Sequence, residues 1–382
     1  MSPDRPQQSS FFQTAPAVRA DGADVLRLHL NESAFGPPPG AVEAVQREAA
    51  DSLPHYPDPA YARFRAALAR HFRVPEEMLA LGNGVDELVL LTSLAFLTAA
   101  PEAATVTTDH TFPGYLAAAT AVGAQVRSLP LRGYRIPADQ LADAVRDGAH
   151  LAFACNPLNP TGALLTRDET GLLLSAARHA PGVLVFDEAY LDFTDPAEHY
   201  ALAAVRDGAR ALVLRTFSKA WGLASLRIGC AIGPPDLVTQ VNRAARALPF
   251  RVSRPAERAV LQALAQPGYL ERVRAETADA RDLLVKGVRT AGAEPLPSAA
   301  NFVMARVPTD SAWVAARLAE RHRVLVRDLG LLNLPGHLRI TVGTREQTER
   351  CATALQAVLA EAPTPVGTAS EQGRRSAAGT PS

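Results

Sequence analysis

The sequence has few lysines, few cysteines and no net charge, and these shortages exclude several classes of protein. Basic and acidic residues both number 39, so the chain lacks the excess positive charge of a nucleic-acid-binding protein. The three cysteines are far apart and odd in number, which argues against a disulfide framework and a Cys-x-x-Cys zinc site. No apolar run reaches the length of a membrane span, and the first 24 residues contain no signal-peptide pattern. We therefore expect a cytoplasmic protein with neither a nucleic-acid nor a membrane partner.

The pattern of apolar runs predicts an α/β sheet. Runs at 151–155, 183–186, 211–216 and 228–233 read as buried strands and alternate with stretches of helical periodicity. Between the first two, "TRDE" from Thr166 is a capping box that begins a helix. Strands separated by helices in this way indicate a parallel sheet with crossover helices.

A different pattern follows residue 255 and predicts a second, smaller α+β domain. It contains a long helix around 269–288, strands at 301–307 and 338–342, and a second capping box at Thr344. A length of 382 residues also favours two domains over one. We predict a flexible N-terminal arm (1–24), a small α+β domain (25–50 and 255–361), a large ligand-binding α/β domain (51–254) and a disordered tail (362–382).

Lysine is almost absent, yet Lys219 follows directly on a predicted buried strand. Lys219 and Lys286 are the only lysines among the 39 basic residues. Ligands of open α/β sheets bind at the carboxyl ends of the strands, where a partly desolvated lysine can lose its proton and form a Schiff base with a carbonyl. Taken alone, Lys219 also fits a solvated surface residue.

Other predicted strand ends carry side chains that suit a pyridine ring. Asp187 can pair with a protonated ring nitrogen, and Tyr190 and Asn159 can donate to a phenolate oxygen on the same ring. For each residue alone, a cap, a core-edge position or a simple turn is the more ordinary reading. No His-Glu-x-x-His motif and no phosphate-binding Gly-x-x-x-x-Gly-Lys motif is present, so a metal site and a nucleotide site have no support.

A phosphate site is predicted where "LGNG" (81–84) precedes an apolar helix. The backbone N–H groups of Gly84, Val85 and Asp86 would face an anion at the helix N-terminus. Further phosphate ligands flank the lysine: Thr216, Ser218 and Arg227. An amine, a ring-nitrogen partner, phenolate donors and a phosphate site together are what pyridoxal 5′-phosphate requires.

Four segments, "NPLNPTG", "DEAYLDF", "TFSKAWGLASLRIG" and "LRITVGT", resemble the fold-type I pyridoxal-phosphate-dependent aminotransferases, most closely the histidinol-phosphate aminotransferase group. The resemblance runs from about residue 28 to about residue 360. It implies the aspartate-aminotransferase-like fold, with a large, mostly parallel sheet domain and a smaller α+β domain. It also implies that Lys219 holds the cofactor and moves the substrate proton, while Asp187, Asn159 and Tyr190 contact the ring.

The resemblance assigns further residues to the cofactor and the substrate. It implies that Phe112 stacks on the ring, and that Tyr56 reaches the phosphate of a neighbouring subunit in a homodimer with shared active sites. His110 is expected to be structural. The substrate residues implied are Arg339, which clamps the polar end, with Arg327, Asn301 and Asn31.

Departures from the family pattern leave the substrate open. The start reads "NESAF", no tyrosine is found upstream of it, and the "FRVSR" segment places Phe250, Arg251 and Arg254 where the family often has Pro-Tyr. We expect transfer between an amino acid donor, glutamate with 2-oxoglutarate, and a keto substrate, with histidinol phosphate and imidazole acetol phosphate as the first pair to consider. The alternatives are an aminotransferase for a specialised-metabolite amino acid and a decarboxylase of the threonine-phosphate type. A non-catalytic module would have lost Lys219, Asp187 or Arg339, and all three are present.

Overall fold

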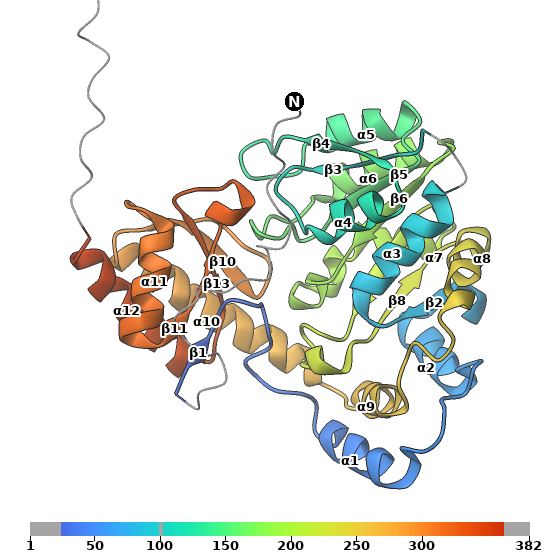
Figure 1. Cartoon of the computed structure of the whole chain (residues 1–382), viewed down its shortest axis with the longest axis horizontal. Helices are drawn as coiled ribbons and strands as arrows, with labels where there is room; N and C mark the ends of the chain where they lie inside the picture. The colour runs from blue at the N-terminus through green and yellow to red at the C-terminus, as the bar shows by residue number, and fades with distance from the viewer. Residues whose placement is uncertain (1–23, 99–101, 363–382) are drawn as a thin grey trace, which may run out of the picture.

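The computed structural model describes residues 24–98 and 102–362, which form a larger and a smaller lobe (Figure 1). Residues 1–23 of the predicted arm and 363–382 of the predicted tail lie outside the described residues. The first described segment, drawn in blue, passes through the smaller lobe before it enters α1 beside the larger one (Figure 1). This path brings the stretch around residue 30 between the two lobes.

A seven-stranded sheet in the order β2-β8-β7-β6-β5-β3-β4 forms the centre of the larger lobe. Only β8 runs antiparallel to its neighbours, so β2, β3, β5, β6 and β7 all end at the same edge of the sheet. The strands are β2 (Leu79–Gly82), β3 (Ala104–Thr108), β4 (Gln125–Leu129), β5 (Leu151–Cys155), β6 (Val183–Asp187), β7 (Leu212–Thr216) and β8 (Gly229–Ile232). The four predicted strands of this region are confirmed as β5, β6, β7 and β8, within two residues at each end.

Helices pack against this sheet in two groups, because α3 contacts α4 and α8 whereas α6 contacts α5 and α7. The predicted capping box is present at the start of α6, where Thr166 and Glu169 exchange hydrogen bonds. The helices of the larger lobe are α1 (Ala41–Ser52), α2 (Ala62–Phe72), α3 (Gly84–Leu97), α4 (Gly114–Ala121), α5 (Ala138–Arg146), α6 (Arg167–Ala177), α7 (Tyr200–Arg206), α8 (Pro235–Ala244) and α9 (Arg254–Leu264).

The smaller lobe contains an antiparallel four-stranded sheet in the order β12-β13-β10-β9 and a short parallel pair, β1-β11. Its strands are β1 (Leu26–Arg27), β9 (Glu294–Pro295), β10 (Phe302–Arg306), β11 (Val324–Leu325), β12 (Arg327–Asp328) and β13 (His337–Thr341). Its helices are α10 (Tyr269–Thr290), α11 (Ser311–His322) and α12 (Arg345–Ala360). The second predicted capping box, at Thr344 and Gln347, is present at the start of α12.

Each of the two lobes has a large apolar cluster of its own. The smaller cluster joins β1, β10, β13, α11, α12 and the second half of α10. The buried residues of α9 and Ala41 of α1 belong to the larger cluster, and these two helices pack against each other. The predicted domain boundaries at residues 50 and 255 assign both helices to the smaller domain and remain a prediction. Ion pairs from Arg254 and Arg258 of α9 to Glu48 of α1 join the two helices.

Within residues 24–98 and 102–362, no helix is both long and apolar enough to cross a membrane. The same residues contain no group of three or more His, Cys, Asp or Glu side chains suited to a metal ion. The three cysteines are free and buried.

Candidate active site

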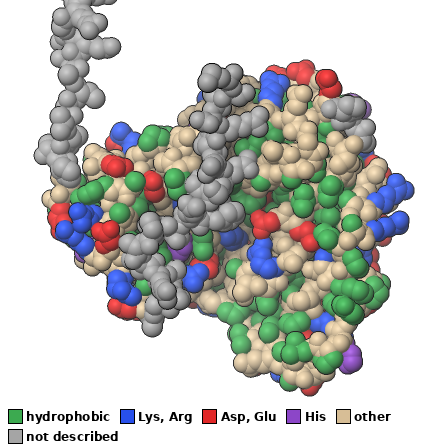
Figure 2. All heavy atoms as spheres, viewed as in Figure 1, with side chains coloured by type: hydrophobic (Ala, Val, Ile, Leu, Met, Phe, Trp, Pro, Cys, Tyr) green, Lys and Arg blue, Asp and Glu red, His purple; other side chains and the backbone are tan. Residues whose placement is uncertain are grey.

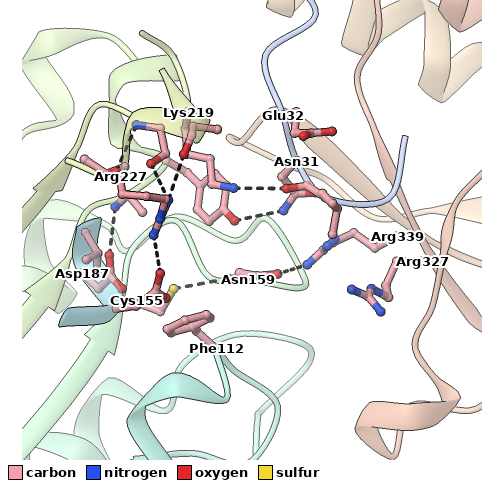
Figure 3. A pocket seen from close by; sticks show the side chains of 18 residues that line it. Asn31, Glu32, Phe112, Cys155, Asn159, Asp187, Lys219, Arg227, Arg327 and Arg339 are labelled. Atoms are coloured by element: carbon pink, nitrogen blue, oxygen red, sulfur yellow. Dashed lines mark hydrogen bonds and ion pairs between the residues drawn. The ribbon is translucent and has the colours of Figure 1, made fainter. Parts of the chain in front are cut away.

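A cavity of about 260 Å³ lies where the strands of the large sheet end, and the smaller lobe closes it from the opposite side (Figure 3). Most of the predicted site residues line it: Val85, Asp86, Phe112, Asn159, Asp187, Tyr190, Thr216, Ser218, Lys219 and Arg227 from the larger lobe, and Asn31, Arg327 and Arg339 from the smaller one. The parallel strands explain this convergence, since their carboxyl ends lie side by side.

Lys219 follows β7 and points its amine into the cavity. Nζ donates a hydrogen bond to the backbone oxygen of Leu30 at 3.1 Å, so the amine is held against the N-terminal segment. Burial, together with the nearby positive charge of Arg339, lowers the pKa of Lys219 to about 8. A larger share of neutral amine is therefore present near neutral pH than on an exposed lysine, as attack on a carbonyl requires.

Asp187 ends β6 at the other side of the cavity from Arg339 (Figure 3). Its Oδ1 accepts the N–H of Ala189 at 3.1 Å and its Oδ2 accepts the hydroxyl of Tyr115 at 2.6 Å. Burial raises the pKa of this carboxyl to about 6, while the hydrogen bond from Tyr115 acts in the opposite direction. A buried carboxylate of raised basicity suits a cationic N–H partner.

Tyr190 is connected to the N-terminal segment through its hydroxyl. The side-chain amide of Asn31 donates to the Tyr190 oxygen at 3.0 Å, and the hydroxyl of Thr341 donates to the other end of the same amide at 3.2 Å. Because the Tyr190 oxygen already accepts a hydrogen bond, its own proton remains available to an acceptor in the cavity. Burial raises the pKa of Tyr190 to about 12, so the hydroxyl remains a donor.

Arg339 reaches from β13 to the turn after β5. Nη1 donates to Oδ1 of Asn159 at 2.5 Å and Nη2 donates to the backbone oxygen of His29 at 2.9 Å. The amide oxygen of Asn159 is thus turned toward the arginine, which leaves the amide N–H₂ as the donor for another group. Burial, together with the charge of Arg327, lowers the pKa of Arg339 to about 10, while the nearby Tyr190 acts in the opposite direction.

Arg327 and Arg339 form one basic wall of the cavity. They lie directly opposite each other in the β12–β13 register, so their side chains share one face of the smaller sheet. Both are buried, with 5% and 3% of their surfaces exposed, and both line the cavity (Figure 3). Two neighbouring guanidinium groups create a site that favours an anion.

The N-terminus of α3 and the loop after β7 form a second anion-binding region. The first N–H groups of a helix have no partner within that helix, and α3 begins at Gly84 with a φ of 78°. Arg227 lies against this glycine, where a Cβ would collide with its guanidinium. Arg227 also bonds Asp86 at 2.5 Å and the hydroxyl of Ser218 at 3.3 Å. These residues fit the phosphate of pyridoxal 5′-phosphate.

The groups in the cavity match each part of that cofactor. The amine of Lys219 suits its aldehyde, the carboxylate of Asp187 its ring nitrogen, and the donors of Tyr190 and Asn159 its phenolate oxygen. Phe112 supplies an aromatic surface across the cavity from Lys219 (Figure 3). The residues present therefore fit the cofactor, and the fit rests on the donor chemistry of this one cavity.

Three predicted site residues lie outside the lining. Gly84 lies next to the guanidinium of Arg227. The side-chain N–H₂ of Asn301 donates hydrogen bonds to the backbone oxygens of Asn31 and Glu32 at 3.2 and 3.4 Å. Asn301 therefore holds the segment that carries Asn31. Tyr56 is 78% exposed and stacks on Phe250 with the ring centroids 4.6 Å apart.

The prediction that the "FRVSR" segment affects the substrate is not supported by the positions of its arginines. Arg251 donates to the backbone oxygen of Leu81 at 2.8 Å. Arg254 binds Glu48 of α1 at 2.6 Å, which Arg258 also binds at 2.9 Å. These arginines join α1, α9 and β2 and are not part of the cavity lining.

Sequence reasoning missed several residues of the site, among them Cys155, Glu32, Tyr115 and His29. Cys155 and Glu32 line the cavity, and Glu32 pairs with Arg27 at 2.7 Å. Tyr115 binds Asp187, and His29 supplies the oxygen that Arg339 binds. Burial and the three nearby arginines lower the pKa of His29 to about 4, so its imidazole is neutral. The sequence pointed only to Glu32, which follows Asn31, and to Cys155, which precedes the "NPLNPTG" turn.

Comparison with known proteins agrees with this geometry. Residues 23–355 match the family model "Aminotransferase class I and II". The chain is 37% identical over 346 residues to histidinol-phosphate aminotransferase 2 of Ralstonia nicotianae, covering 90% of this chain and 91% of the relative. The structure of histidinol-phosphate aminotransferase from Sinorhizobium meliloti in complex with pyridoxal-5′-phosphate is 28% identical, with a TM-score of 0.78 over 88% of this chain and 91% of that chain. A mutant aspartate aminotransferase from Thermus thermophilus, 24% identical, shares the fold with a TM-score of 0.76 over 87% of this chain and 96% of that chain.

Proposed function

The chain belongs to the aminotransferase class I and II family, and on this premise we propose that it transfers an amino group between glutamate and a phosphorylated keto substrate. It is a pyridoxal 5′-phosphate-dependent aminotransferase with the aspartate-aminotransferase-like fold predicted from its sequence. Histidinol phosphate, with its keto counterpart imidazole acetol phosphate, is the first substrate pair to test. The curated relative from Ralstonia nicotianae carries that substrate in its name and supports the choice.

The observation that carries the substrate proposal is that Arg327 and Arg339 lie side by side on neighbouring strands. A phosphate monoester has up to two negative charges and three oxygens, so it can occupy both guanidinium groups, whereas an α-carboxylate needs only one. The two arginines are neighbours across β12 and β13 and both face the cavity. We assign the phosphate of the keto substrate to this pair, and the α-carboxylate of glutamate to Arg339.

The bound cofactor supplies an electron sink that stabilises negative charge at the substrate α-carbon. Lys219 would hold the cofactor through its amine, and the same amine would carry the proton to and from the substrate α-carbon. The backbone oxygen of Leu30, 3.1 Å from Nζ, keeps the amine on the side of the cavity where the N-terminal segment passes. The low pKa of Lys219 supports this assignment, because a base must be neutral to accept a proton.

The remaining side chains orient the ring. Asp187 would pair with the ring nitrogen and keep it positively charged. Tyr190 and Asn159 would donate to the phenolate oxygen, because Asn31 and Arg339 already occupy their acceptor atoms. Phe112, which lines the same cavity, would offer its ring for stacking.

We further propose a homodimer in which Tyr56 serves the neighbouring active site. Large apolar side chains are exposed near α1 and the segment before α9, including Val42, Leu53, Tyr56 and Leu248. Figure 2 shows hydrophobic side chains gathered over the end of the molecule where α1 and α9 lie in Figure 1. Exposed apolar side chains gathered in this way are typical of an interface.

Mixing two inactive proteins tests the shared site. Lys219→Ala removes the amine and Tyr56→Ala removes the residue given to the neighbour. A mixed dimer contains one site with both residues intact, so we expect activity to return when the two variants are unfolded and refolded together. Lack of recovery in demonstrated mixed dimers would contradict the shared site.

The free, buried cysteines support our proposal of a cytoplasmic location.

The substrate proposal is tested by adding amino donors to the holoprotein and following its visible absorbance. We expect histidinol phosphate to convert the cofactor at much lower concentration than histidinol. Arg327→Met should raise the KM for histidinol phosphate by about 10- to 100-fold, the equivalent of one lost charged hydrogen bond. Arg306→Met is the matched control, because Arg306 lies on β10 of the same sheet but binds Glu294 at the surface. Equal responses to histidinol and histidinol phosphate would refute the substrate. Release of carbon dioxide from an added amino acid such as threonine phosphate, in place of a keto product, would indicate the decarboxylase.

A further inference from the structure

Asp187 owes its position to a residue that does not line the cavity. The hydroxyl of Tyr115 lies 2.6 Å from Oδ2 of Asp187, and Tyr115 is fully buried. A carboxylate can only accept, so the phenol is the donor. The other oxygen, Oδ1, accepts from the N–H of Ala189 at 3.1 Å. Together the two donors act on both oxygens and determine the plane of the carboxylate group.

Tyr115 is itself held rigidly by its neighbours. Its ring stacks on Phe153 of β5 with the centroids 4.5 Å apart and the planes 8° from parallel. The ring of Phe112 meets it edge-on at 5.4 Å. Gly114 makes this arrangement possible, because a Cβ at that position would collide with the Phe112 ring. The hydroxyl is therefore aimed at Asp187 by packing and does not depend on solvent.

The hydrogen bond also controls how basic the carboxylate is. Burial raises the pKa of Asp187, and the hydrogen bond from Tyr115 is the strongest influence that lowers it. Without that donor, the desolvation of the carboxylate would be less opposed and its affinity for a proton would increase. In a hydrogen bond to a bound pyridine nitrogen, a more basic carboxylate would shift the shared proton away from the nitrogen and toward itself.

We propose that Tyr115 is a positioning residue for the reaction, which orients Asp187 and keeps the shared proton on the cofactor's ring nitrogen. The inference rests on the proposed pairing of Asp187 with that nitrogen. It assigns to Tyr115 a task that packing alone does not require, since a phenylalanine would stack on Phe153 equally well.

The test is the affinity of the apoprotein for pyridoxamine phosphate between pH 5 and 9. Tyr115→Phe removes one oxygen and keeps the ring. We expect binding near neutral pH to weaken by about tenfold, and the midpoint of its pH dependence to move up by about one pKa unit. Tyr61→Phe is the matched control, because Tyr61 is also a buried phenol but exchanges its hydrogen bonds with the backbone of Val252. We expect the control to shift neither quantity.

Tyr115→Phe in an Asp187→Asn protein distinguishes an effect of Tyr115 on Asp187 from an effect of Tyr115 on the packing of the core. If Tyr115 acts through Asp187, Tyr115→Phe should change the affinity less than twofold in that background. An equal loss in both backgrounds, or an unchanged pH midpoint in the single variant, would overturn the inference and leave the pairing of Asp187 intact. An Asp187→Asn protein that binds the probe like the parent would instead overturn the pairing, and the inference with it.

A second variant keeps the test decisive if Tyr115→Phe does not fold. Incorporation of 3-fluorotyrosine at position 115 retains the hydroxyl and the shape of the ring but makes the phenol a stronger donor. The pH midpoint for binding pyridoxamine phosphate should then move down, opposite to the shift expected for phenylalanine. A midpoint that moves up or stays in place would overturn the inference.

Discussion

Arg339 donates from Nη1 to Oδ1 of Asn159 across 2.5 Å and so joins the smaller lobe to the turn after β5. The two residues are 180 positions apart in the chain. The guanidinium that we assign to the substrate anion thus also orients the amide that we assign to the ring oxygen. Binding of the anion and alignment of the ring are therefore expected to depend on each other.

Arg339→Lys should impair both steps. Lysine keeps the charge but cannot contact Asn159, His29 and an anion in one plane. We expect the KM for the amino donor to rise about 100-fold, equal to nearly 3 kcal/mol of lost charged hydrogen bonding, and kcat to fall as well. Steady-state kinetics measure both constants, with Arg306→Lys as the surface control. A normal kcat would show that Asn159 does not depend on Arg339.

Capture of the cofactor by the apoprotein should accelerate as pH rises through about 8, because only the neutral amine of Lys219 attacks the aldehyde. The lowered pKa means that the amine is already largely neutral at a pH where an exposed lysine is still charged. Arg339→Met removes a positive neighbour, so the pKa of Lys219 should rise and the rate profile should move to higher pH. Stopped-flow absorbance measures the profile, and a shift to lower pH would contradict the electrostatic argument.

Stability should depend strongly on the buried charges next to the site. Arg215 of β7 forms ion pairs with Glu188 and Asp192, and all three side chains are largely buried. Arg215→Met would leave two carboxylates buried without a counter-charge, so we expect unfolding to become easier by about 3–5 kcal/mol. Glu276→Gln breaks an exposed helical pair with Arg272 and should cost about 0.5 kcal/mol or less. Denaturant titration compares the two variants, and equal effects would contradict the role of burial.

The site residues at the strand ends could be predicted because parallel strands bring their carboxyl ends together. Asp187 ends a buried strand, Asn159 and Lys219 each follow one, and all three line one cavity. Local pattern cannot show contacts made by distant segments. Asn31 binds Tyr190 from 159 positions away, and Arg254 binds Glu48 from 206.

Tyr115 illustrates the same limit at closer range. Its position in the first turn of α4 reads as an ordinary core residue, and its ring does pack in the core. Only the three-dimensional arrangement shows that its hydroxyl reaches β6 and binds Asp187, 72 positions later in the chain. Arg254 gave the opposite error, since its charge suggested a role with the substrate while its partner lies on α1.

Borohydride reduction followed by peptide mass spectrometry tests the central assignment most directly. Reduction fixes the cofactor on whichever amine holds it, and the chain has only two lysines, Lys219 in the cavity and Lys286 exposed on α10. We predict that the peptide containing Lys219 carries the added mass in stoichiometric amount and that the peptide containing Lys286 remains unmodified. A holoprotein whose cofactor is recovered on Lys286, or is not attached to Lys219, would contradict the account.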